Sequence, residues 1–117
     1  MPESVLETRL LRLMKVHRLP PPSLQHRVRA GSSVARVDFA YPELKLAIEA
    51  DGYRHHSRPV DWERDRRRRN RLTEAGWHVV HVTWNDLVQR PEEVILQIRG
   101  MMRRLRPRPD LNRRPSP

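Results

Sequence analysis

Hydrophobic residues follow two different periods along the chain, and each period predicts one kind of element. In the stretch 4–16, leucines and a methionine recur three or four residues apart, as in a helix that buries one face. A second stripe of this kind starts at Val94 and predicts a last helix that begins near Pro91. Between them, 35–40 and 44–51 alternate between apolar and polar side chains, as strands do. The chain therefore predicts an α/β fold.

Three further stretches complete the expected architecture. A weak strand is predicted over 24–29, and a highly charged helix over 61–75, which ends at Gly76. The run 77–84 is rich in valine and aromatic residues on both faces, so we expect a strand that is covered on both sides and central in the sheet. The apolar side chains of the charged helix that could reach a core are Trp62, Leu72 and Ala75.

Length and composition predict one domain with a tail. The 117 residues suit a single core, which we place in 1–102. From 103 to 117 arginine and proline dominate, so we expect a disordered basic tail. No apolar run is long enough for a membrane span, and no secretion signal is visible at the start. We therefore expect a cytoplasmic protein that has no membrane partner.

The charge of the chain points to a phosphate-rich partner. The formal net charge is +10, and 22 of the 24 basic residues are arginines. A basic surface attracts a polyanion and releases its counterions, and the planar guanidinium suits phosphate. A GC-rich genome would also raise the ratio of arginine to lysine, although it would not explain the net charge. Because the chain has no cysteine, oxygen or imidazole ligands would have to hold any metal.

The alternating strands bring three carboxylates to one face of a predicted β-hairpin. If the apolar positions of 35–40 and 44–51 face the core, the acids between them face the other way. These acids are Asp38, Glu49 and Asp51, and crowded like charges favour a divalent cation, Mg²⁺ or Mn²⁺. Alternatively, arginines such as Arg36 or Arg54 pair with the acids in a surface network.

Two neighbouring motifs extend this candidate chemistry. His56 follows the acids closely and could move a proton, although an adjacent histidine pair is often only packed or exposed. The 61–71 stretch holds six arginines against three acids, enough positive charge to follow a nucleic-acid backbone. Alternatively, Asp61 and Asp65 neutralise arginines at helical spacing. The arginines that we expect to bind the backbone are Arg64, Arg66, Arg67, Arg68 and Arg71.

The segment VDFAYPELKLAIEADGYRHH, followed by WERDRRRRNRLTEAGWHVVHVTWNDL, resembles the very-short-patch-repair endonucleases and their bacterial relatives in the PD-(D/E)XK nuclease superfamily. The resemblance covers roughly 7–102. It implies a restriction-endonuclease-like fold with a mixed central sheet flanked by helices, and cleavage or nicking of DNA with magnesium, RNA not being excluded. By this resemblance Asp38 is the first metal-binding aspartate, Glu49 and Asp51 form the second motif, Glu7 is the acid of the first helix and His56 follows the Asp-Gly turn.

The chain also departs from the pattern of that superfamily. Asp51 stands where a lysine is expected two residues after Glu49, and the cysteine ligands and wedge aromatics of the repair enzymes are not visible. Mismatch specificity is therefore not implied. The chain could be the C-terminal part of a longer toxin-antitoxin or defence protein. Two other functions stay open, a noncatalytic nucleic-acid-binding module and a structural or partner-binding domain whose charge keeps it soluble.

Overall fold

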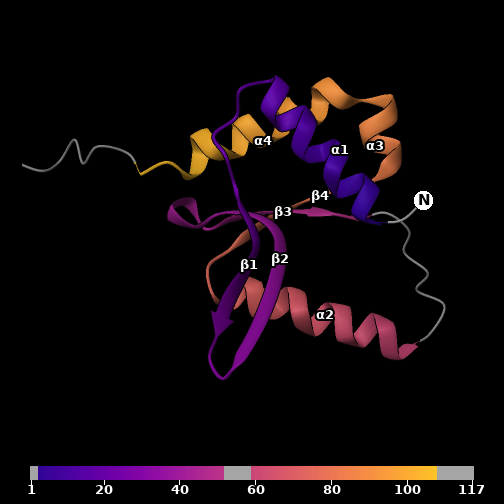
Figure 1. Cartoon of the computed structure of the whole chain (residues 1–117). Helices are drawn as coiled ribbons and strands as arrows, with labels where there is room; N and C mark the ends of the chain where they lie inside the picture. The colour runs from indigo at the N-terminus through magenta and orange to yellow at the C-terminus, as the bar shows by residue number, and fades with distance from the viewer. Residues whose placement is uncertain (1–2, 52–58, 108–117) are drawn as a thin grey trace, which may run out of the picture.

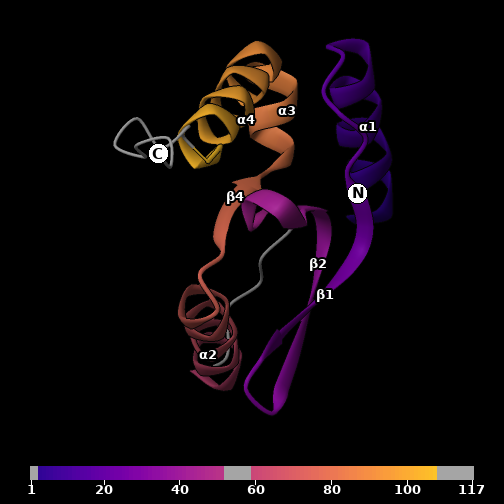
Figure 2. The same ribbon diagram turned by 90° about the vertical axis from the view of Figure 1, so that its left-hand side faces the viewer.

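Figure 1 shows the computed structural model, which describes residues 3–51 and 59–107. In chain order the elements are α1 (Glu3–Val16), β1 (Ser23–Ala30), β2 (Ser33–Tyr41), the short 3-10 helix η1 (Pro42–Leu44), β3 (Leu46–Ala50), α2 (Pro59–Glu74), β4 (His78–Val82), α3 (Trp84–Gln89) and α4 (Pro91–Leu105). The sheet lies between α1, α3 and α4 on one side and α2 on the other (Figure 2). The predicted mixed sheet flanked by helices is confirmed. None of the helices in the described ranges has the length and hydrophobicity to span a bilayer.

The four strands have the order β1-β2-β3-β4, in which the last pair is parallel and the other two are antiparallel. The prediction that 77–84 forms a central strand is wrong, because β4 lies at an edge of the described sheet and Trp84 already belongs to α3. The interior place belongs to β3, where Leu46, Ala47 and Ile48 are all fully buried. Helix α2 lies between β3 and β4 in the chain and provides the crossover that a parallel pair needs.

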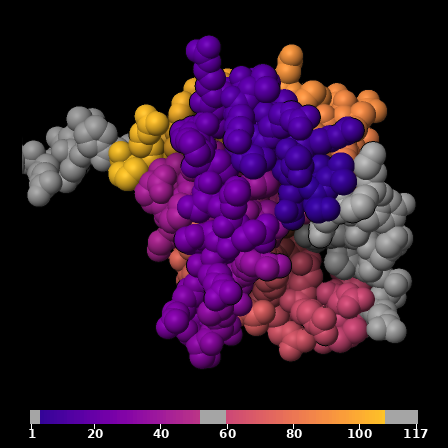
Figure 3. Space-filling model, in the orientation of Figure 1, coloured from indigo at the N-terminus to yellow at the C-terminus, as the bar shows by residue number. Residues whose placement is uncertain are grey.

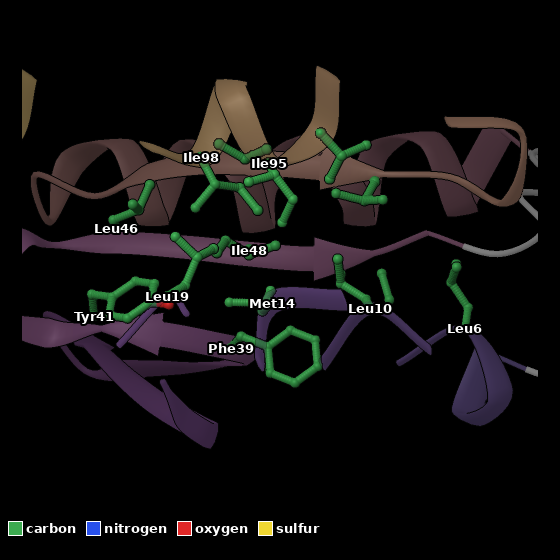
Figure 4. Packing of buried hydrophobic residues seen from close by; sticks show 14 residues of the cluster. Leu6, Leu10, Met14, Leu19, Phe39, Tyr41, Leu46, Ile48, Ile95 and Ile98 are labelled. Atoms are coloured by element: carbon green, nitrogen blue, oxygen red, sulfur yellow. The ribbon is translucent and has the colours of Figure 1, made fainter. Parts of the chain in front are cut away.

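The main core lies between the sheet and the layer of α1 and α4 (Figure 4). Leucines and Met14 of α1 and isoleucines of α4 provide the buried stripes that their spacing predicts. Strand residues on the facing side of the sheet complete the core. The labelled members in Figure 4 are Leu6, Leu10, Met14, Leu19, Phe39, Tyr41, Leu46, Ile48, Ile95 and Ile98.

A second, smaller core packs α2 against the other side of the sheet. Leu72 is 1% exposed and is surrounded by small side chains, which let the helix approach the strands closely. Trp62 was expected to join it, but its side chain is 56% exposed. Ten residues at about 100° each place Trp62 roughly 80° around the helix from Leu72. The other buried members are Val28, Ala35, Val37, Ala40 and Ala47.

Strand β2 changes its surroundings at Asp38. The alternating pattern predicts Val37 and Phe39 on one face, but Phe39 lies in the main core whereas Val37 packs beside α2. Residues before Asp38 pair only with β1, whereas Phe39 and Ala40 after it pair with both β1 and β3. Opposite Asp38 in the register, Gln25 has a φ of 49°, which is uncommon for a non-glycine residue. The β1–β2 hairpin beyond this bend, residues 26–37, forms an arm beside α2 (Figures 1 and 2).

Helix α3 was not predicted, although its start has a clear signal. The Thr83 side chain accepts a hydrogen bond from the Asp86 amide at 3.1 Å, and the Asp86 carboxylate accepts one from the Thr83 amide at 3.0 Å. This reciprocal capping box lowers the pKa of Asp86, chiefly through the bond from the Thr83 backbone. The valine-rich residues just before it favoured a longer strand instead.

Helix α4 continues beyond the expected end of the domain. It runs to Leu105, so Arg103 and Arg104 are helical and do not belong to a disordered tail. Leu105 packs against the main core, which explains why the helix extends this far. Of the rest of the expected tail, 108–117 lies outside the described residues.

We expect Ile98→Ala to lower the free energy of unfolding by about 2–5 kcal/mol, because it leaves a cavity in the main core. Leu96→Ala on the same helix serves as the control, since Leu96 is 63% exposed, and it should change stability by less than about 0.5 kcal/mol. Urea unfolding followed by circular dichroism measures both. Equal losses in the two variants would contradict the placement of α4.

Candidate active site

Asp38 and Glu49 are both held by backbone amides of the facing strand where β2 and β3 part. Phe39 pairs with Ile48, so one step further along the register Asp38 lies opposite Glu49. The Asp38 carboxylate accepts a hydrogen bond from the Ala50 amide at 2.8 Å. In return, the Glu49 carboxylate accepts one from the backbone amide of Asp38. Hydrogen bonds from backbone amides to side-chain carboxylates therefore replace backbone–backbone hydrogen bonds at this point. They bring the two carboxylates together.

A guanidinium group from α2 completes this arrangement. Arg68 forms an ion pair with Glu49 and also donates a hydrogen bond of 2.6 Å to the backbone carbonyl of Arg36. The Glu49 side chain is only 12% exposed. An arginine therefore does neutralise one of the acids, as the alternative interpretation expected, but the partner is Arg68 and not Arg36. Arg54, the other arginine named for that role, lies outside the described residues.

The pKa of Glu49 is raised above its ordinary value. Burial is the largest cause, and the nearby charge of Asp38 adds to it. The hydrogen bond and charge of Arg68, and the bond from the Asp38 amide, lower the pKa without cancelling the effect of burial. The negative charge of Glu49 is therefore only partly compensated, and a further cation at this place would stabilise its ionised form.

The donor atoms suit an oxygen-preferring metal ion, but the expected trio of acids does not form in the structure. Within 3–51 and 59–107, no three acid or histidine side chains are placed together so as to hold a metal. Asp51 follows the last residue of β3, its amide donates to the Val82 carbonyl at 2.8 Å, and its side chain has an interaction of its own. Asp38 and Glu49 thus fit a cation as a pair.

Glu7 and His56, the other two expected site residues, have different positions. Glu7 lies half-buried on α1 and accepts a hydrogen bond of 3.4 Å from the side chain of Gln25. Since Gln25 lies opposite Asp38 in the register, Glu7 approaches the same part of the sheet from the helix layer. It does not join the carboxylate pair in a group of metal-binding type. His56 lies outside the described residues.

The arginines of α2 divide into two sets. Arg64, Arg66 and Arg67 are exposed, whereas Arg68 and Arg71 are half-buried. Local pairing also occurs, as the alternative predicted, because Asp65 pairs with Arg69 at 3.3 Å and Glu63 with Arg67 at 4.0 Å. Arg64 and Arg66 have no ion-pair partner in the described part of the chain, so this helix keeps exposed positive charge.

His81 is a candidate that the sequence interpretation missed. In the parallel register, His81 of β4 is the direct partner of Glu49. It is half-buried and has an interaction of its own. A histidine at this position can exchange a proton near neutral pH. The local sequence holds no signal for this neighbour, because the pairing joins strands that α2 separates in the chain.

The chain belongs to a restriction-endonuclease-like family, REase_MTES_1575, whose model matches residues 22–102. It is also similar to two curated proteins of Mycobacterium tuberculosis, "Uncharacterized protein MT2308" of strain CDC 1551 and "Uncharacterized protein Rv2248" of strain H37Rv. The identity to each is 33% over 105 residues, which make up 89% of this chain. The chain spans 39% of the length of these relatives.

A solved structure, "Homing Endonuclease I-Bth0305I Catalytic Domain", has the same fold. It superposes with a TM-score of 0.65 at 24% identity. The match covers 87% of this chain and 97% of that domain. At this level of identity the likeness concerns the fold, and it covers nearly the whole of the other domain.

We expect an NMR titration of side-chain carboxyl carbons to place the pKa of Glu49 above its ordinary value, and Arg68→Gln to raise it further. Because the raised value belongs to the folded state, the folded chain binds the proton more tightly than the unfolded one. The contribution of Glu49 to stability should therefore fall as pH rises through the window that begins at the ordinary value of 4.5. A lower pKa in Arg68→Gln would contradict the described pair.

Proposed function

We propose that this chain is a metal-dependent nuclease that hydrolyses or nicks DNA, with Asp38 and Glu49 at its catalytic centre. The observation that carries the proposal is the placement of these two carboxylates where β2 and β3 part, each held by a backbone amide of the facing strand. Membership of a restriction-endonuclease-like family supports it, as does the shared fold with the catalytic domain of a homing endonuclease. The closer kinship to very-short-patch-repair endonucleases remains part of the proposal.

Asp38 and Glu49 would hold Mg²⁺ or Mn²⁺, with Asp51 as a further ligand or as a base. Bound there, the ion would supply a Lewis acid and make water a better nucleophile at neutral pH. The chain itself has to provide oxygen ligands with little competing solvent, which the low exposure of Glu49 supports. It also has to shield two neighbouring negative charges from each other, and Arg68 serves that purpose while it contacts Glu49.

Other residues take supporting roles in this proposal. His56, as the resemblance implies, or His81, the partner of Glu49 in the register, would exchange the proton. Glu7 would act from α1, beside the strands that carry Asp38. The exposed arginines of α2 would contact the phosphate backbone of DNA. They are Arg64, Arg66 and Arg67, and the half-buried Arg68 and Arg71 would act nearer the pair of acids.

A second candidate function is a noncatalytic nucleic-acid-binding module. The ion pair between Arg68 and Glu49 favours it, because an arginine already compensates one of the two acids. The aspartate at position 51, where the superfamily pattern has a lysine, points the same way. Such a module would bind nucleic acid without forming product at any metal concentration.

We expect Asp38→Asn to lower nicking of supercoiled plasmid in Mg²⁺ or Mn²⁺ by at least about 10- to 100-fold, the loss typical even for a residue that only supports a metal ligand, since it removes one of the two charged ligands. Asparagine keeps a side-chain oxygen that can accept the hydrogen bond from the Ala50 amide, so the variant should still fold. DNA binding should stay equal or become tighter, because a charge that repels phosphate is lost.

Glu43→Gln serves as the matched control, because Glu43 is an exposed acid on η1 outside the pair. A chelator should abolish nicking by the unchanged chain. Full nicking by Asp38→Asn would exclude the proposed mechanism. Binding without product from the unchanged chain, whatever the metal, would support the noncatalytic module.

We expect Arg68→Gln to bind Mn²⁺ more tightly, measured by calorimetry without DNA, because a competing cation no longer contacts Glu49. Arg68→Lys should fall between this variant and the unchanged chain. Arg69→Gln on the same helix is the control, since Arg69 pairs with Asp65 and not with the site. Identical Mn²⁺ affinities for all four proteins would show that Arg68 does not compete for the pair.

A further inference from the structure

The β1–β2 arm has one strongly basic face. In its antiparallel register Arg27 lies directly opposite Arg36, and Arg29 lies opposite Val34. Residues directly opposite each other point to the same side of a hairpin, and all four side chains are exposed. Figure 3 shows the arm as a prominent part of the surface that reaches the lower end of the molecule. Three arginines therefore gather on the outward face of this short ribbon.

The three neighbouring arginines repel one another and so destabilise the arm. Like charges directly across a strand pair are destabilising. Within the described ranges, no carboxylate forms an ion pair with Arg27, Arg29 or Arg36. The backbone carbonyl of Arg36 accepts a hydrogen bond from Arg68, but the guanidinium group of Arg36 takes no part in that bond. A partner that supplies negative charge would relieve this repulsion.

The other face of the arm is fixed to the body of the protein. Val28, Ala35 and Val37 are buried around Leu72 of α2. The ring of His26 lies 5.6 Å from that of Trp77. The outward arginines therefore stand on a supported ribbon, so binding would not have to order them from a flexible loop.

We propose that the outward face of the arm lies in the major groove of duplex DNA and positions the duplex at the site. This inference rests on the proposed function and names its substrate as double-stranded B-form DNA. The major groove, about 12 Å wide, admits a two-stranded ribbon, whose strands lie about 4.8 Å apart. The major groove of duplex RNA is too narrow for side chains to read. Arg36 precedes Asp38 by two residues, or about 7 Å along β2, so DNA held on the arm is bound next to the part of the sheet that carries the site.

The test compares two charge-matched double variants of the full chain, R27Q/R36Q on the arm and R103Q/R104Q on α4, on the other side of the sheet (Figure 2). Binding to a DNA duplex is measured by fluorescence anisotropy in chelator, at several salt concentrations. We expect R27Q/R36Q to weaken binding about tenfold or more and to reduce the salt slope by about 2 if both arginines contact phosphates. R103Q/R104Q should weaken it less than about twofold.

Thermal unfolding checks that the arm stays folded. Because R27Q/R36Q removes a repulsive pair, its Tm should equal or exceed that of the unchanged chain. Equal losses of affinity in the two double variants, or a duplex RNA of the same sequence bound as tightly as the DNA, would overturn the proposal. The measurement needs no cleavage. If the unchanged chain binds DNA through its arm but does not cleave it, the proposed nuclease is refuted and the role of the arm is not. If R27Q/R36Q nicks DNA normally and binds it with unchanged affinity, the role of the arm is refuted and the proposed nuclease is not.

Discussion

The exchange of hydrogen bonds between Asp38 and the strand that carries Glu49 determines how the rest of this molecule is arranged. Backbone hydrogen bonds between β2 and β3 could continue past Phe39, but the Ala50 amide donates its hydrogen bond to the Asp38 carboxylate instead of to a backbone carbonyl of β2. The two strands can therefore separate without leaving that amide unpaired, which would be costly in a buried position. Beyond the separation, β2 stays with β1 alone and packs against α2. The pair of acids and the start of the arm thus lie at the same point of β2.

Charge is distributed very unevenly around this point. The carboxylates of Asp38 and Glu49 lie side by side in a region of low exposure, and the guanidinium of Arg68 forms an ion pair with Glu49. Most other arginines remain on the surface, on α2, on the arm and on α4. A local excess of negative charge inside a basic protein suits a centre that binds a cation while the surrounding surface attracts a polyanion. The composition alone indicates only the polyanion.

The two cores explain how so short a chain can support such a site. The main core holds α1 and α4 against the sheet with large hydrophobic side chains, and it has more buried members than the second core. The second core is made largely of alanine and valine, so α2 lies close enough to the strands for Arg68 to reach Glu49. Family membership agrees with this architecture, and the chain spans only part of the length of its curated relatives.

The amino-acid sequence by itself determined the helical stripes of α1 and α4 and the hairpin of β2 and β3, because these follow from local periods of 3.6 and two residues. Tertiary structure decided the rest. Asp51 follows the end of β3 and has an interaction of its own, and His81 lies beside Glu49 because β4 pairs with β3 across an intervening helix. The position of β4 at the edge and the inward direction of Arg68 likewise depend on how α2 packs. Local periodicity contains no information about which distant segments pair, since that choice depends on the packing of the whole chain.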